Sequence, residues 1–130
     1  LGVHSDYRLN NKLNVERRLN VIIYLTEDWQ EAYGGNLELW DVGMKKCLKK
    51  VLPVYNRCVI FNTDKDSNHG HPEPLTTPEH ITRRSIALYY YTASGVGGEP
   101  GQRNKTHYKP RPKDRWSLRY YLNKLIKKKG

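Results

Sequence analysis

The sequence predicts a mainly β domain with the architecture of a sandwich or a barrel. Short stretches rich in β-branched and aromatic residues are separated by polar turns, as the strands of an all-β protein are. Helical periodicity occurs only near the C-terminus, so the strand–helix alternation of a doubly wound α/β sheet is missing. The length of 130 residues fits one domain.

The predicted strands rest on different patterns. Residues 19–25 and 85–91 give the strongest signal, because they are nearly continuous runs of β-branched, aromatic and other apolar residues. Residues 36–40 alternate polar and apolar side chains, which is the period of a half-buried strand. Pro53 lacks a backbone donor, so its segment is expected at a sheet edge. The full set of predicted strands is 19–25, 36–40, 51–54, 57–61 and 85–91.

The composition changes after residue 93. Residues 94–113 are rich in Gly, Pro and basic side chains, which predicts an extended linker. Residues 114–130 predict a basic amphipathic helix, because apolar side chains recur there at the spacing of one helical face. These side chains are Leu118, Tyr121, Leu122 and Leu125. The expected organisation is therefore a β core over 1–93, followed by the linker and the helix.

The positive charge is concentrated in this C-terminal part. The chain has 23 Lys and Arg against 13 Asp and Glu, a net charge of +10, and residues 103–130 hold 11 of these cations with Asp114 as their only acid. Cations interleaved with aromatic residues suit phosphate contacts and base stacking. A non-catalytic nucleic-acid-binding protein is therefore one functional hypothesis. A solvated tail, or a helix packed on the core, explains the same charge.

Membrane and redox signals are simple. No apolar run approaches the roughly 18 residues that a spanning helix needs, so no membrane partner is expected. Cys47 and Cys58 are too few for a disulfide framework and too far apart for a CxxC motif. Two reduced thiols in a cytosol-like compartment, and hence a cytoplasmic location, are expected. One bridge between them is the alternative.

His4-Ser5-Asp6 is the first candidate for chemistry. Residues i and i+2 of a strand point to the same face, so His4 and Asp6 can reach one metal ion. Taken alone, a His-x-Asp sequence also arises by chance.

His69-Gly70-His71 is the second candidate. A histidine from a distant segment would complete a set of two histidines and one carboxylate, which suits non-haem Fe(II) and leaves coordination positions open. The alternative is a turn histidine beside Pro72.

Arg83-Arg84-Ser85 opens the strongest predicted strand. Arg83 and Ser85 share a face, and an arginine beside a hydroxyl can bind a carboxylate through charge-assisted hydrogen bonds. The alternative is a solvated strand end with two arginines.

The three clusters together form an ordered set that resembles the Fe(II)/2-oxoglutarate-dependent oxygenases, and most closely their prolyl-4-hydroxylase-like branch. The set consists of His4, Asp6, His69, Arg83 and Ser85. Residues 24–29 (YLTEDW) and 34–37 (GGNL) are similar to segments of that branch, and Phe61 lies eight residues before His69, as it does there. The resemblance covers residues 2–92.

The resemblance implies a fold and residue roles. The fold would be a double-stranded β-helix, a jelly-roll and cupin-like relative, incomplete at its N-terminus because family members have further elements upstream. The residues implied to bind Fe(II) are His4, Asp6 and His69. Arg83 would pair with a carboxylate of 2-oxoglutarate, and Ser85 or Tyr24 would add a hydrogen bond to it.

The resemblance also implies an activity. The reaction would be hydroxylation of a substrate with release of succinate and CO2, with ascorbate as a further cofactor. Prolyl residues of a protein are the leading substrate, and a small molecule with a prolyl-like group is the alternative. His71 competes with His69 as the distal ligand, and the spacing from Phe61 favours His69. A nucleic-acid demethylase is disfavoured, because the second arginine of those enzymes would fall at Tyr89.

Overall fold

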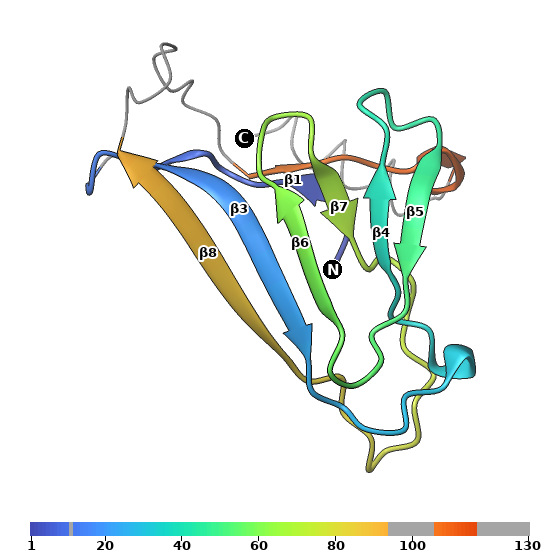
Figure 1. The fold of residues 1–130 in the computed structure, drawn as a ribbon. Coiled ribbons are helices and arrows are strands. Elements are labelled where there is room, and N and C mark those ends of the chain that lie inside the picture. Colours follow the sequence, from blue (N-terminus) through green and yellow to red (C-terminus); the bar gives the residue numbers. More distant parts are fainter. Residues whose placement is uncertain (11, 94–105, 117–130) are drawn as a thin grey trace.

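The computed structural model describes residues 1–10, 12–93 and 106–116, and Figure 1 shows their arrangement. The elements in chain order are β1 (His4–Ser5), β2 (Leu9–Asn10), β3 (Val15–Tyr24), η1 (Glu31–Tyr33), β4 (Leu37–Trp40), β5 (Cys47–Val51), β6 (Cys58–Asn62), β7 (Asn68–Gly70), β8 (Ser85–Ala93), β9 (His107–Tyr108) and η2 (Pro112–Trp116). Both helical segments of the described part are short 3-10 helices. The prediction of a mainly β domain is confirmed.

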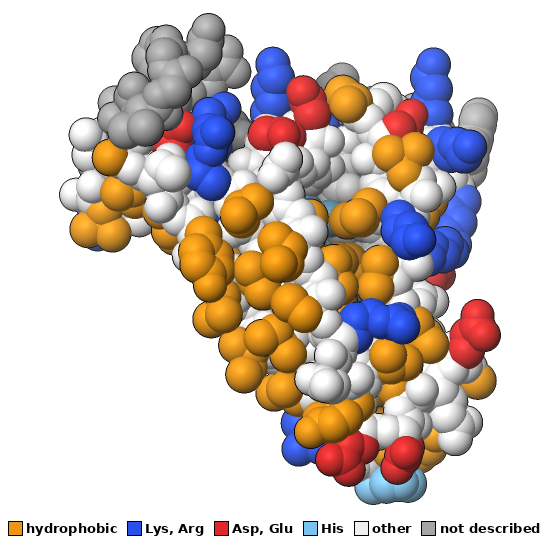
Figure 2. Space-filling view, in the orientation of Figure 1, with side chains coloured by type: hydrophobic (Ala, Val, Ile, Leu, Met, Phe, Trp, Pro, Cys, Tyr) orange, Lys and Arg blue, Asp and Glu red, His pale blue; other side chains and the backbone are white. Residues whose placement is uncertain are grey.

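The strands form two antiparallel sheets. One sheet has the order β5-β4-β7-β1-β9, and the other contains β2, β3 and β6, with β8 on the opposite edge of β3. From β3 onwards the chain passes from one sheet to the other and back, which is the connectivity of a jelly-roll-type sandwich. Figure 1 shows β8, β3 and β6 on one side and β7, β4 and β5 on the other. In the same orientation, Figure 2 shows hydrophobic side chains gathered over β8, β3 and β6.

A bulge in β3 determines which of its side chains face the other sheet. The register between β3 and β8 shifts between Arg17 and Leu19. A bulge adds one residue to a strand and so interrupts the alternation of faces. Arg17 therefore points to the same side as Asn20, which is three positions further on, and the two side chains are hydrogen-bonded and buried.

The interior is polar where β1, β3 and β7 meet. The buried apolar residues include Val3, Val21, Tyr24, Trp29, Leu37 and Met44, whereas the buried polar residues include His4, Asp6, Arg17, Asn20, Asn68 and His69. Burial of polar groups costs free energy unless each has a partner. Such a concentration of them in one place marks a candidate site.

One predicted strand differs in position. The edge strand expected over 51–54 is instead β5 (Cys47–Val51), which does lie at the edge of its sheet. After Val51 the chain turns, with the Val54 amide donating to the Leu52 carbonyl, and Pro53 is buried. Because Pro53 has no N–H, it ends the ladder instead of extending it.

The predicted C-terminal helix lies mostly outside the described residues. Its first residues, 114–116, belong to the 3-10 helix η2, so no α-helix begins there in the described part. Residues 117–130, which carry the apolar stripe, are outside it, as are residues 94–105 of the expected linker. Later in the expected linker, His107 and Tyr108 form β9, a strand that the composition did not predict.

No helix in the described ranges combines the length and apolar character that crossing a membrane requires. Cys47 on β5 and Cys58 on β6 are both free thiols. Cys58 is exposed and Cys47 is half-buried, so the expectation of unpaired cysteines agrees with the structure.

Candidate metal centre

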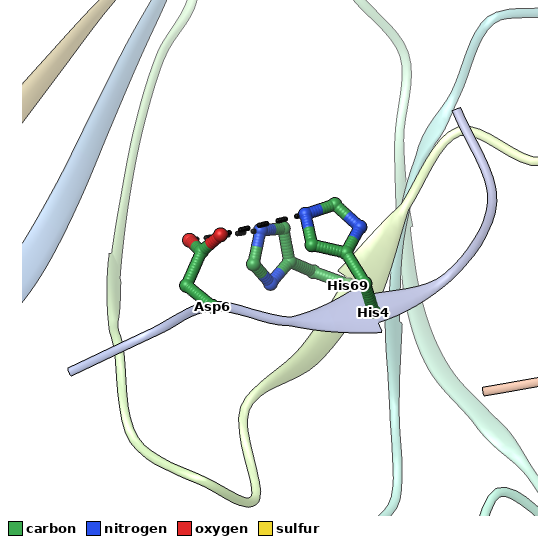
Figure 3. A group of neighbouring side chains, drawn as sticks. All are labelled: His4, Asp6 and His69. Carbon is green, nitrogen blue, oxygen red and sulfur yellow. Dashed lines mark ion pairs between the residues drawn. The ribbon is translucent and has the colours of Figure 1, made fainter. Parts of the chain in front are cut away.

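Three side chains with metal-ligating atoms converge between β1 and β7 (Figure 3). One ligand atom each from His4, Asp6 and His69 lies within 4.8 Å of the others. His4 and His69 are direct cross-strand partners, which places both rings on one face of the sheet. Asp6 follows β1 by one residue and shares the face of His4, and Figure 3 shows its carboxylate directed at both rings.

A glycine permits this close approach of the two strands. A Cβ atom at Gly70 would lie 2.7 Å from the Gly2 carbonyl oxygen and 2.9 Å from the Val3 Cα. Both obstacles are backbone atoms, so neither strand could give way without separating. The absence of a side chain at Gly70 therefore keeps His4 opposite His69.

Backbone carbonyls orient both imidazoles. His4 Nδ1 lies 2.9 Å from the Gly2 carbonyl oxygen, and His69 Nδ1 lies 2.9 Å from the Ser67 carbonyl oxygen. A carbonyl can only accept, so each Nδ1 carries a proton and donates. Each Nε2 is then directed at the Asp6 carboxylate, at 3.5 Å in both cases.

The groups around the cluster keep the Asp6 carboxylate ionised. Burial opposes ionisation of Asp6, but hydrogen bonds from His4 and Asn20 and the charge of Arg17 lower its pKa to about 2. The hydrogen bond to Asp6 raises the pKa of His4, whereas burial lowers the pKa of His69. Asp6 is therefore an anion at neutral pH, and a metal ion would take the place of a proton on the facing nitrogens.

The donor set fits a transition metal. Two imidazole nitrogens and one carboxylate, all inward-facing, are the ligand types of a facial triad that leaves other positions open. Without a cation or a proton, the Nε2 lone pairs of His4 and His69 would face the negative carboxylate of Asp6. A divalent cation between the three groups would convert that repulsion into coordination.

Two residues of β3 hold Asp6 in place. Asn20 Nδ2 donates to Asp6 Oδ2 at 2.8 Å, and Arg17 Nη2 lies 3.4 Å from the same oxygen. Arg17 Nε also donates to Asn20 Oδ1 at 2.9 Å, which fixes the orientation of the amide. The guanidinium lies over the ring of Tyr89, 3.8 Å from its centroid. Sequence reasoning did not single out Arg17 or Asn20 as site residues, and the usable signal was a polar Asn20 inside an apolar strand.

A cavity of about 210 Å³ joins the cluster to Arg83. Its lining includes the three cluster residues together with Arg83, Ser85 and His71, and does not include Arg84. Arg83 and Ser85 thus share the cavity, as their spacing predicted. Within the described ranges, Arg83 forms no ion pair with an acidic residue. A half-buried guanidinium without a carboxylate partner in a cavity suits an anionic ligand.

Two neighbours determine where the Arg83 side chain lies. Arg83 Nε donates to the Gly35 carbonyl at 3.1 Å, and a Cβ atom at Gly35 would lie 3.1 Å from Arg83 Cδ. The guanidinium is 5.1 Å from the ring centroid of Tyr24. Tyr24 is fully buried and is not among the residues lining the cavity. Burial raises the pKa of its hydroxyl, and the charge of the neighbouring Arg83 opposes that rise.

His71 lies in the cavity but outside the cluster. Its ring lines the same space, and burial and the charge of Arg83 lower its pKa to about 4. The group of converging ligand atoms contains His69 and not His71. Strand β7 ends at Gly70, and the His71 amide donates to the Leu1 carbonyl.

The fold and the site define a class of protein: a jelly-roll-type sandwich with a His-x-Asp and a distal histidine facing one cavity. A family model described as the 2OG-Fe(II) oxygenase superfamily matches residues 1–91, and the chain belongs to this superfamily. Prolyl 3-hydroxylase OGFOD1 of Mus musculus is 33% identical over 82 residues. That match covers 60% of this chain and 15% of the mouse protein, so the chain spans only a small part of the length of this curated relative.

Proposed function

We propose that this chain carries the catalytic centre of an Fe(II)- and 2-oxoglutarate-dependent dioxygenase, which hydroxylates prolyl residues of a protein and releases succinate and CO2. The observation that carries the proposal is the convergence of His4, Asp6 and His69 in a cavity that Arg83 also lines. A metal-binding set and a free cation in one cavity suit a cosubstrate that has both a metal-chelating end and a distant carboxylate.

His4 and His69 would bind the iron through Nε2, and Asp6 through its carboxylate. Bound Fe(II) supplies the activation of dioxygen that the protein's own groups lack. The chain's residues prepare the ligands: the carbonyls of Gly2 and Ser67 hold the Nδ1 protons, so that Nε2 is free to coordinate.

Arg83 would bind the far carboxylate of 2-oxoglutarate. Its Nε is engaged by the Gly35 carbonyl, which leaves the terminal nitrogens for the ligand. Ser85 lines the same cavity and would add a hydroxyl donor. Tyr24 lies beside the Arg83 guanidinium, and a hydrogen bond from its hydroxyl to the cosubstrate stays a prediction.

A prolyl substrate is supported by two observations. The relative that is 33% identical is named a prolyl 3-hydroxylase. The cavity has apolar walls at Ile22, Leu37 and Ala87, which suit a saturated ring. A free amino acid or another small molecule with a prolyl-like group is the competing substrate, and ascorbate stays a prediction.

The test is succinate formation by purified, Fe(II)-loaded protein under reducing conditions. We expect slow succinate formation with 2-oxoglutarate alone, and faster formation with a prolyl-containing peptide that gains one oxygen atom by mass spectrometry. His69→Ala should abolish both, whereas Arg84→Ala should retain the slow reaction. Iron-loaded protein that makes no succinate would contradict the proposal. If free proline accelerates the reaction and peptides do not, the substrate is a free amino acid and not a protein.

The nucleic-acid hypothesis loses part of its basis in the described tail. Arg111 is buried and paired with acids, and Lys113 pairs with Glu73. Paired cations contribute less to phosphate binding than free ones. Most of the other cations of residues 103–130 lie outside the described residues, so nucleic-acid binding by this tail stays a prediction.

A further inference from the structure

Residues 106–116 fold onto the strand that carries the candidate metal ligands. They lie beyond the residues matched by the family model, 1–91. Strand β9 pairs antiparallel with β1, with Tyr108 opposite His4. The Lys109 amide donates to the Val3 carbonyl at 2.8 Å, and the ring of Tyr108 lies 5.2 Å from that of His4. Figure 1 shows this segment, in orange, running along β1.

Strand β1 depends on this neighbour because it is very short. It consists of His4 and Ser5, and it lies between β7 and β9 in the sheet. Without β9 it would be an edge strand held on one side only, and edge strands exchange and fray readily. The conformation of β1 decides where the side chains of His4 and Asp6 point.

Arg111 anchors the segment to the rest of the sheet. Its Nε and Nη2 bind the two carboxylate oxygens of Asp114 at 2.7 and 2.8 Å, in a bidentate pair. Its Nη1 contacts Glu73, which follows β7, and lies 3.9 Å from Glu38 of β4. Arg111 thus connects the segment to two other parts of the β1 sheet.

The surroundings make this arginine hard to replace. Arg111 is 5% exposed and Glu38 is 2% exposed. Burial opposes the positive charge of Arg111, but hydrogen bonds to Asp114 and Glu73 raise the pKa of Arg111 above its ordinary value. Glu38 also accepts a hydrogen bond from Trp40 Nε1 at 2.9 Å and forms an ion pair with Lys50 Nζ at 3.2 Å. Removing one partner of such a buried network leaves the others with uncompensated charge.

We infer that residues 106–116 form a clamp that positions the metal-binding strand β1, with Arg111 as the positioning residue that holds the clamp closed. The inference rests on the proposed function in one respect, because it takes His4 and Asp6 as metal ligands. Arg111 acts on the metal only through β9 and β1.

The first experiment uses side-chain variants of the full chain. Arg111→Ala should raise amide hydrogen exchange in a peptide covering residues 1–8, and leave exchange in β3 and β8 close to that of the unaltered protein. It should also weaken Co(II) binding about tenfold, the usual scale for loss of a group that orients a ligand. Arg111→Lys should restore part of both effects. Lys113→Ala is the matched control, because Lys113 lies in the same segment and contacts the same Glu73, but its side chain is exposed.

The second experiment interrupts the backbone pairing. Lys109→Pro removes the amide that donates to the Val3 carbonyl, and Lys109→Ala retains it. The proline variant should reproduce the exchange and Co(II) effects of Arg111→Ala, and the alanine variant should not.

The outcomes separate the clamp from the proposed function. If the unaltered protein binds no Co(II) or Fe(II), the proposed function fails, and the exchange data still test the clamp. If the unaltered protein binds metal, but Arg111→Ala changes neither amide hydrogen exchange in residues 1–8 nor metal affinity, the clamp inference is wrong. An equal rise of exchange in all strands would also overturn it, since Arg111 would then support the whole fold and not β1 in particular.

Discussion

Arg17 and Asn20 meet on the cavity side of β3, with Arg17 Nε 2.9 Å from Asn20 Oδ1, although residues three apart on a regular strand face opposite ways. The bulge between Arg17 and Leu19 makes this contact geometrically available. Asn20 then donates to Asp6. A backbone irregularity in one sheet therefore orients a candidate metal ligand supplied by the other.

Asn20 should control metal affinity through Asp6. Asn20→Ala removes the donor to Asp6 Oδ2 and leaves Arg17 Nε without its acceptor, so we expect Co(II) affinity to fall about tenfold. Spectrophotometric Co(II) titration measures this. Asn62→Ala, an exposed position on β6, is the control. Unchanged affinity in the Asn20 variant would show that Asp6 needs no support from β3.

The two histidines of the HGH sequence should differ. His69→Ala should abolish Fe(II) binding, because its Nε2 is one of the converging atoms, and His71→Ala should retain most of it. Anaerobic calorimetry with Fe(II) gives both values. The reverse result would mean that His71 is the distal ligand and that β7 rearranges when metal binds.

Arg83 should fix the cosubstrate, and Arg84 should not. Loss of a paired carboxylate contact typically costs about 2–5 kcal/mol. Arg83→Ala should therefore weaken 2-oxoglutarate binding by roughly two to three decades. Arg84 does not line the cavity, so Arg84→Ala should have little effect. Binding of 2-oxoglutarate to Co(II)-loaded protein is the measurement, and equal losses in the two variants would refute the assignment.

Gly70→Ala should separate β1 from β7. The added Cβ would meet the backbone of Gly2 and Val3, so we expect a loss of about 1–3 kcal/mol in the free energy of unfolding, together with weaker metal binding. Urea denaturation and Co(II) titration test the two effects. At Gly43 the nearest atom would be 3.7 Å away, so Gly43→Ala is the matched control. If both variants behave alike, close strand approach at Gly70 is not what holds the site.

Much of the fold could be predicted because the long strands carry strong local patterns. The apolar runs of β3 and β8 and the alternation in β4 are visible in the sequence. By contrast, β7 is Asn68–Gly70 and β9 is His107–Tyr108, and such short polar strands have no periodicity to detect. They exist because neighbouring strands pair with them.

The sequence by itself determined which chemistry-bearing residues act in pairs. His4 and Asp6 share one face, and so do Arg83 and Ser85, because side chains two residues apart in a strand point the same way. The spacing from Phe61 favoured His69 over His71, and the tertiary structure supplies the physical reason, because antiparallel pairing sets His69 opposite His4 and β7 ends at Gly70. It also decided that Asn20 supports Asp6 and that Arg111 holds the segment over β1. These relations join residues far apart in the chain, and they depend on strand register, a bulge and buried charge pairing, for which local residue patterns carry no signal.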